Sequence, residues 1–213
     1  MDLHKVTEAL AGVPHISSER GKEIYEFIRE QRPASVLELG FAHGASSCYI
    51  GAALQANGHG RLTTIDLEDA RRREPNIEQL VHATGLLDWV YPVHTPTSYT
   101  WELMRMLEHR DDGQWMFDFA FIDGAHSWFV DGLAFYLVDK LLKPGGWVLF
   151  DDLDWTYATS PTLGETEFVR SMPEDERTTP QIGKVYELLV KTHPGYCEFR
   201  NDGSWGWARK MPS

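Results

Sequence analysis

Acidic side chains gather where two predicted strands end. Asp123 follows the apolar run 117–122, and Asp151 and Asp152 end the next apolar run, which begins at Trp147. The carboxyl ends of neighbouring parallel strands share one edge of a sheet, so these carboxylates are expected to lie close together. Three clustered carboxylates repel one another unless a proton or a cation lies between them. Because oxygen ligands suit Mg²⁺, Ca²⁺ and Mn²⁺, Asp123, Asp151 and Asp152 are predicted to bind a divalent metal, with Mg²⁺ as the first candidate.

His126 stands three residues after Asp123 and adds a titratable group to the same edge. Imidazole titrates near neutral pH, so His126 could be the general base that removes a proton from a hydroxyl, with Asp123 beside it as a second catalytic group. A plainer interpretation stays open, in which one acid caps the following helix and another faces solvent.

A glycine turn forms the second region with chemical potential. A short buried strand, 35–39, runs through Gly40 and Gly44 into the helical run 46–56. Glycine permits positive φ and close approach of a ligand, and the helix start presents unpaired N–H groups. The pattern Glu38-x-Gly40-x-x-x-Gly44 is neither the G-x-G-x-x-G fingerprint nor a P-loop. Glu38 disfavours a pyrophosphate ligand and favours a cationic ligand that carries an adenosine.

Asp66 ends the next predicted strand, 61–66. A carboxylate at this place can accept hydrogen bonds from both ribose hydroxyls. NAD enzymes use an acid there too, so Asp66 indicates an adenosine without choosing the cofactor, and a solvated acid at a strand end is the plainer alternative. Ser98 precedes a helical run and suits the role of helix cap.

The run ELGFAHG, residues 38–44, resembles the first motif of the class I methyltransferases that use S-adenosylmethionine (SAM). In that family a Gly-x-Ser element often faces the adenine, and Pro96-Thr97-Ser98 lacks the glycine, so only Ser98 is carried over. His126 could contact the cofactor instead of acting as a base, and Trp128 could stack on adenine or pack in the core. The cofactor contacts that the resemblance implies are Glu38, Gly40, Gly44, Asp66, Ser98, Asp123 and Trp128.

The carboxylates resemble those of the divalent-metal O-methyltransferases of the catechol and caffeoyl-CoA type, which have Asp after the fourth strand and Asp-Asn after the fifth. Asp152 replaces that Asn, and the Asp-Asp pair is more similar to bacterial natural-product sugar O-methyltransferases, such as the macrocin and mycinamicin enzymes. The resemblance implies Mg²⁺-assisted transfer of a methyl group from SAM to a hydroxyl of a small sugar or phenol. The departure puts a catechol substrate in doubt, not the metal.

Two other functions stay open. An NAD-dependent dehydrogenase would suit Asp66, but it would need a glycine fingerprint that the chain lacks. A SAM-binding or metal-binding module without turnover would suit the glycine turn, but it would not need clustered carboxylates.

The elements that must position these residues alternate between strand and helix, which predicts an α/β fold with a doubly wound, mostly parallel, Rossmann-like sheet of seven strands. Pro92 predicts that its strand lies at an edge. Lys143–Gly146 is predicted to be a turn, and Asn201–Ser204 the turn of a C-terminal antiparallel hairpin. Strands are expected at 35–39, 61–66, 89–94, 117–122, 147–151, 196–200 and 205–210, and helices at about 19–31, 46–56, 77–84, 98–109, 127–142 and 182–191.

Residues 1–213 are expected to form one methyltransferase domain. The segment 153–180 has little periodicity and several prolines, and a loop of this length is predicted to be a lid or acceptor-binding loop. Trp155 and Tyr157 at its start could stack on a sugar or an aromatic acceptor.

Composition excludes several partners. A formal net charge of −12 disfavours binding to nucleic acid, which needs clustered Lys and Arg. No apolar run approaches a membrane span, no signal peptide is recognisable, and two cysteines imply no disulfide framework, so a cytoplasmic protein is predicted. The expected partner is a small hydroxylated acceptor, and a homo-oligomer stays open.

Overall fold

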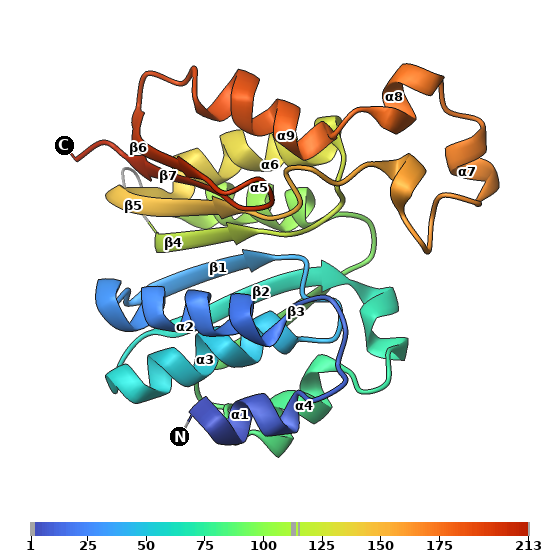
Figure 1. Cartoon of the computed structure of the whole chain (residues 1–213). Coiled ribbons are helices and arrows are strands. Elements are labelled where there is room, and N and C mark those ends of the chain that lie inside the picture. Colours follow the sequence, from blue (N-terminus) through green and yellow to red (C-terminus); the bar gives the residue numbers. More distant parts are fainter. Residues whose placement is uncertain (1–2, 112–113, 115, 213) are drawn as a thin grey trace.

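The computed structural model of the protein describes residues 3–111, 114 and 116–212. Within this part of the chain, seven strands form one sheet in the order β3-β2-β1-β4-β5-β7-β6. The first five strands are parallel, and β7 runs antiparallel to both β5 and β6 (Figure 1). The sheet confirms the predicted doubly wound fold with its antiparallel C-terminal hairpin. The strands are β1 Ser35–Leu39, β2 Arg61–Leu67, β3 Val90–Thr95, β4 Phe117–Ile122, β5 Leu142–Phe150, β6 Tyr196–Asn201 and β7 Gly206–Lys210.

Helices cover both faces of the sheet, because side chains along each strand point alternately to opposite sides. On β1, Val36 faces the layer formed by α1 to α4, whereas Leu37 and Leu39 face the layer formed by α5, α6 and α9. Burial on both faces explains the nearly continuous apolar strands. The helices are α1 Leu3–Ala9, α2 Ser18–Gln31, α3 Ala45–Asn57, α4 Ile77–Ala83, α5 Tyr99–His109, α6 Trp128–Leu141, α7 Glu167–Arg170, α8 Glu174–Thr178 and α9 Gln181–Val185, with 3₁₀ turns η1 Glu68–Arg72 and η2 Tyr157–Thr159 and a π-helical turn η3 Tyr186–Val190.

The strand that contains Pro92 lies at one edge of the sheet, as predicted. The bend predicted at Lys143–Gly146 lies within β5 and not before it, and Gly145 has the positive φ of a turn residue, 80°. The pairing of β5 with β4 is irregular: Leu142 pairs with Phe117, and the next pair is Trp147 with Phe119. The residues between these two pairs have no partner in the register with β4, so the Pro-Gly-Gly cluster bulges out of the ladder while β5 continues on either side of it.

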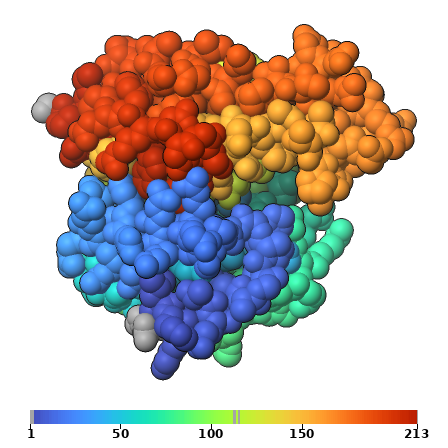
Figure 2. Space-filling view, viewed as in Figure 1, coloured from blue at the N-terminus to red at the C-terminus, as the bar shows by residue number. Residues whose placement is uncertain are grey.

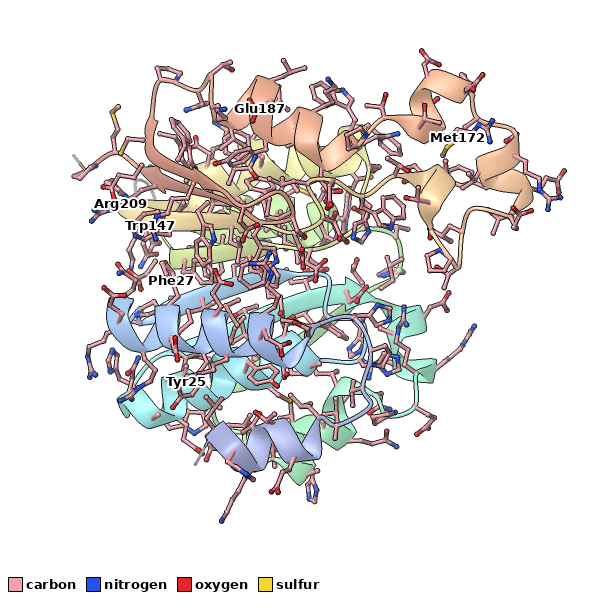
Figure 3. All side chains as sticks on the ribbon, viewed as in Figure 1. Tyr25, Phe27, Trp147, Met172, Glu187 and Arg209 are labelled. Carbon is pink, nitrogen blue, oxygen red and sulfur yellow. The ribbon has the colours of Figure 1, made fainter. Side chains whose placement is uncertain are left out.

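The segment 153–180 contains three short helices, of three, four and five residues, where no periodicity was expected. Helices this short complete barely one turn, so they leave no repeating apolar pattern in the sequence. The segment projects from the body of the molecule, as the orange region of Figure 2 shows. In Figure 3, Met172 lies on this projection, far from Phe27 and Trp147, whose rings lie 5.8 Å apart where α2 packs on β5.

Among the helices of the described residues, none is both long and apolar enough to cross a membrane.

Candidate active site

A cavity of about 550 Å³ opens at the carboxyl ends of the parallel strands. This is the edge at which open α/β sheets bind ligands, and the volume suits a small organic molecule. Gly40 and Asp66 line the cavity from the ends of β1 and β2, and Asp123, His126 and Asp152 line it from the ends of β4 and β5. The cavity therefore brings together the two regions that the sequence analysis treated separately.

The glycine turn has the backbone geometry that its residue types predict. Gly40 has φ of 85° and Gly44 has φ of 95°, a region that side-chain-bearing residues rarely adopt. A Cβ atom on Gly40 would lie 1.9 Å from the backbone oxygen of Asp123. The ends of β1 and β4 therefore touch backbone to backbone, which only glycine allows. Gly44 precedes α3 as its N-cap residue and packs against Ile77.

Asp66 ties the end of β2 to this turn. Its Oδ2 accepts hydrogen bonds from the backbone N–H groups of Phe41 and Ala42 at 3.0 and 2.7 Å, and its Oδ1 accepts from Leu67 at 2.6 Å. A carboxylate offers about four acceptor positions, so these bonds do not exhaust its capacity. Asp66 both shapes the turn and lines the cavity.

The structure places Glu38 behind the cavity wall, where it is fully buried beneath α3. Its Oε2 accepts from the hydroxyls of Ser47 and of Thr64, the latter at 2.6 Å, and its Oε1 has no hydrogen-bond partner. Burial raises the pKa of Glu38 to about 7, although hydrogen bonds from Ser46, Ser47 and Thr64 oppose the shift. Glu38 therefore supports the turn from below, whereas the sequence analysis expected it to contact the cofactor.

Replacing Glu38 with glutamine is expected to remove a pH-dependent loss of stability. The carboxyl titrates near 4.5 when exposed and near 7 in the folded protein, so the folded state keeps a proton that the unfolded state releases. Stability must then fall as pH rises from about 4.5 to 7, by about 3 kcal/mol for this group. Urea unfolding across this range should show the Glu38→Gln variant gaining that amount relative to the wild type. If the free energies of unfolding of the two proteins changed with pH in parallel, the raised pKa of Glu38 would be contradicted.

Asp123, His126 and Asp152 form a compact group in the cavity. Each offers one ligand atom, and these atoms lie within 4.8 Å of one another. His126 Nε2 lies 2.7 Å from Asp152 Oδ2 and 3.7 Å from Asp123 Oδ1. The ring N–H is not aligned on either oxygen, so these contacts are ion pairs more than hydrogen bonds. His126 and Asp152 also have positive φ, 56° and 59°, which surrounding contacts must maintain.

The two carboxylates change the protonation of His126. Burial by itself would lower the pKa of the imidazole, but contacts with Asp123 and Asp152 outweigh burial and raise the pKa to about 10. Without a further cation the ring is an imidazolium at neutral pH, so it must lose a proton before it can act as a base. Burial raises the pKa of Asp123, and burial together with the neighbouring charges of Asp123 and Asp152 raises that of Asp151 to about 8.

Asp151 does not belong to the group of converging ligand atoms, in contrast to the prediction. Its Oδ1 accepts the backbone N–H of Asp152 at 2.7 Å, and it also interacts with the side chain of Trp205. The donor set that does converge, two carboxylates and one imidazole, fits a divalent cation that accepts both oxygen and nitrogen ligands. His126 thus takes the place that the sequence analysis assigned to Asp151.

Of two further residues predicted to contact the cofactor, Ser98 lies in the cavity and Trp128 does not. Ser98 lines the cavity and also caps α5, accepting the backbone N–H of Thr100 at 3.1 Å. Trp128 lies outside the cavity, at the start of α6, where it lines a separate hollow with Phe129 and Leu188. Because its ring is partly exposed there, neither stacking in the cavity nor packing in the core describes Trp128.

Several cavity residues were missed by the sequence analysis. The segment before α2 contributes His15, and Arg73 follows η1, with its guanidinium donating to His15 Nε2 at 3.4 Å. Neither residue stands at the end of a strand, so no local signal marks it. Tyr99 follows Ser98 directly and could have been found as the neighbour of a predicted cap.

The start of the projecting segment packs on the loop that carries His126. The rings of Trp155 and His126 lie 4.9 Å apart, and Tyr157 donates a hydrogen bond to the backbone oxygen of Ala125 at 3.3 Å. Trp155 and residues 160–163 also line the cavity. The segment therefore forms one wall of the site.

The sequence and the structure of this chain were compared with those of known proteins. Residues 37–153 match the sequence model of a methyltransferase domain family. No match was found among curated protein sequences.

Several solved structures are similar over nearly the whole chain. An O-methyltransferase from Bacillus cereus in complex with SAH has 20% identity and a TM-score of 0.65, covering 99% of this chain and 90% of that chain. TomG from Streptomyces achromogenes, an O-methyltransferase of tomaymycin synthesis in complex with SAM, has 20% identity and a TM-score of 0.67, covering 98% and 89%. The SAH-bound methyltransferase PaMTH1 from Podospora anserina has 16% identity and a TM-score of 0.68, covering 99% and 88%. At these identities the likeness establishes the fold.

Proposed function

Because this chain belongs to the methyltransferase domain family, we propose that it transfers a methyl group from SAM to a hydroxyl oxygen of a small molecule. The observation that carries the proposal is the single cavity, which joins the glycine turn and Asp66 to the group of Asp123, His126 and Asp152. Similar folds that bind SAM or SAH and are described as O-methyltransferases support it.

The donor half of the cavity is assigned to SAM. Gly40 lets the cofactor approach the backbone, Gly44 shapes the turn from outside the cavity, and the start of α3 adds unpaired N–H groups. Asp66 would accept from the ribose hydroxyls, and Ser98, which lines the same cavity, would face the adenine. Glu38 would act indirectly, by supporting the turn from beneath α3.

Replacing Asp66 with alanine is expected to weaken binding of S-adenosylhomocysteine (SAH) by about 1.5–3 kcal/mol, the usual effect of losing hydrogen bonds to a charged group. Because Asp66 also holds Phe41 and Ala42, Asp66→Asn serves as a milder variant that keeps one acceptor oxygen. Titration calorimetry measures both. Asp69→Ala is the matched control, since Asp69 is an exposed acid on η1 that pairs with Arg72. Unchanged SAH affinity in Asp66→Ala would refute this assignment.

The acceptor half is assigned to the acidic group. Asp123, His126 and Asp152 could hold a divalent cation, for which Mg²⁺ and Mn²⁺ are the candidates. Such a cation, when bound, would lower the pKa of an acceptor hydroxyl. The residues of the chain hold the hydroxyl close to the donor, and proximity supplies much of the rate. We assign His126 and Asp123 as the catalytic residues that contact the acceptor and its proton.

The acceptor is proposed to be a phenol or a natural-product sugar. Trp155 lines the cavity beside His126, and an aromatic face packs well on a planar ring or on the apolar face of a sugar. TomG acts in tomaymycin synthesis, which is in keeping with a natural-product acceptor.

The family match and the site geometry argue against the two alternative functions, a dehydrogenase and a binding module without turnover. Membership of the methyltransferase family argues against an NAD-dependent dehydrogenase. A binding module without turnover would not need a strained histidine between two carboxylates, and an assay of methyl transfer separates it from an enzyme.

The segment 153–180 is proposed to act as a lid over the acceptor within a single domain. It lines the cavity through Trp155 and residues 160–163, yet its outer part projects from the body (Figure 2). Limited proteolysis is expected to cut this segment first, and SAH together with an acceptor should slow the cut. The exposed hairpin turn at 202–203 provides the control, since ligands should not protect it. First cuts elsewhere, or no protection, would count against a lid.

A further inference from the structure

We propose that Tyr99 and Asp131, a buried pair outside the acidic group, are positioning residues that hold His126 in its place. The loop 123–127 joins β4 to α6 and carries His126 between Ala125 and Ser127. It is this loop, more than the His126 side chain, that the pair contacts. The inference rests on the proposed function only in that it gives His126 a role in the reaction. The contacts of Tyr99 and Asp131 with the loop do not depend on that role.

The pair binds the backbone on both sides of His126. The N–H of Ala125 donates to the Tyr99 hydroxyl at 3.0 Å, and the N–H of Ser127 donates to Asp131 Oδ2 at 2.9 Å. The Tyr99 hydroxyl in turn donates to Asp131 Oδ1. Residues before and after His126 are thus fixed to one connected unit, which α5 and α6 supply together.

The unit is rigid because it is buried. Asp131 is fully buried, and Tyr99 and Ser127 are almost fully buried. Both carboxylate oxygens of Asp131 have partners, as a buried acid requires. Asp131 also donates its own backbone N–H to the Ser127 carbonyl at 2.9 Å, so the first turn of α6 and the loop constrain each other.

His126 needs this support because its backbone is strained. Its φ of 56° lies in the left-handed region, which a residue with a side chain adopts only when neighbouring contacts enforce it. Tyr99 also closes the space beside the loop, since a Cβ on Gly124 would lie 2.5 Å from the Tyr99 ring. Without the two anchors, the backbone at His126 is free to return to a negative φ and turn the imidazole away from Asp123 and Asp152.

The test uses Tyr99→Phe and Asp131→Asn in the full chain, with no acceptor and no added metal. The first variant keeps the ring and removes the hydroxyl, and the second keeps the shape and removes the charge. Nuclear magnetic resonance follows amide hydrogen exchange at Ala125 and Ser127 and the ring resonances of His126, which depend on the Trp155 ring 4.9 Å away. We expect exchange to accelerate on the order of 10- to 100-fold at Ser127, which loses a hydrogen bond to a charged group, and about 2- to 10-fold at Ala125, whose acceptor is the neutral Tyr99 hydroxyl. The His126 resonances should shift in both variants.

Tyr186→Phe is the matched control. The Tyr186 hydroxyl is also buried and contacts the carbonyls of Arg200 and Trp207 at 2.9 and 2.7 Å, but it lies in the C-terminal hairpin region. Its loss should lower the melting temperature by a similar amount and leave Ala125, Ser127 and His126 unchanged. A merely structural role for Tyr99 and Asp131 would leave the His126 resonances unchanged in all three variants, even where exchange at Ala125 or Ser127 accelerates, and that result would overturn the proposal. Should one variant fail to fold, the other gives the same readout.

Failure of the proposed function would look different. An enzyme that binds no SAH would leave the exchange and resonance changes intact, because neither measurement uses a cofactor or an acceptor. Where turnover is measurable, the positioning role predicts a lower kcat in Asp131→Asn at saturating SAM, with SAH affinity kept, since Asp131 does not line the cavity.

Discussion

Replacing Gly40 with alanine is expected to weaken SAH binding strongly. The new Cβ would lie 1.9 Å from the backbone oxygen of Asp123 and 2.7 Å from its carbonyl carbon, and neither atom belongs to a flexible side chain. Alanine at a φ of 85° adds about 1–2 kcal/mol of backbone strain, and forced separation of packed elements adds about 1–3 kcal/mol. The glycine turn must therefore move away from β4. Calorimetry should show SAH affinity reduced by roughly 30-fold or more.

Gly203→Ala separates the clash from the strain. Gly203 has φ of 100°, yet a Cβ there meets nothing within 4 Å, and the residue lies in the turn between β6 and β7. This control should lose about 1–2 kcal/mol of stability and keep its SAH affinity. If Gly40→Ala bound SAH as well as Gly203→Ala does, the glycine turn would not be the cofactor site.

Removal of divalent cations is expected to reduce methyl transfer by more than about 100-fold and to leave SAH binding intact. The reason is chemical, because the side chains of Asp123, His126 and Asp152 form the group that could hold the cation, whereas the glycine turn and Asp66 are the part of the same cavity that we assign to the donor. Methyl transfer from SAM to a panel of phenols and sugars would be measured with EDTA and after return of Mg²⁺ or Mn²⁺. Asp152→Ala should behave like EDTA, whereas Asp154→Asn, an exposed acid two residues away, should not. Undiminished transfer in excess chelator would remove the metal from the mechanism.

His126→Ala then distinguishes two roles of the imidazole. If His126 is the base, its loss should cost about 10²–10⁴-fold in turnover, and if it only holds a cation, return of excess metal should restore part of the rate. The pH profile gives a second criterion. Asp123 and Asp152 raise the pKa of His126 to about 10, so a base in the metal-free site gains activity as pH rises toward 10. Asp152→Asn removes one of these charges, lowers the pKa and should move that rise to lower pH.

The order of elements in this chain can be predicted from the sequence because its signals are local. The apolar run at 117–122 is a strand with the predicted bounds, and Pro92 lies at an edge, since a missing donor is a property of the residue itself. The glycine turn was predicted for the same reason: positive φ at Gly40 and Gly44 follows from residue type. The bounds of β5 were missed because the strand begins before the Pro-Gly-Gly cluster, where Leu142 pairs with Phe117, and resumes after it, where Trp147 pairs with Phe119.

The partners of the site residues depend on the tertiary structure. Chain spacing places Asp123, His126 and Asp152 at one edge of the sheet, but it does not say where each side chain points. That direction follows from the positive φ of His126 and Asp152, which packing imposes against local preference. The same packing turns Asp151 toward Trp205 and places Trp128 in a separate hollow, and it brings His15 to the cavity from a distant segment. Residue type determines which backbone conformations have low energy, whereas contacts between distant elements determine which strained conformations the folded protein maintains.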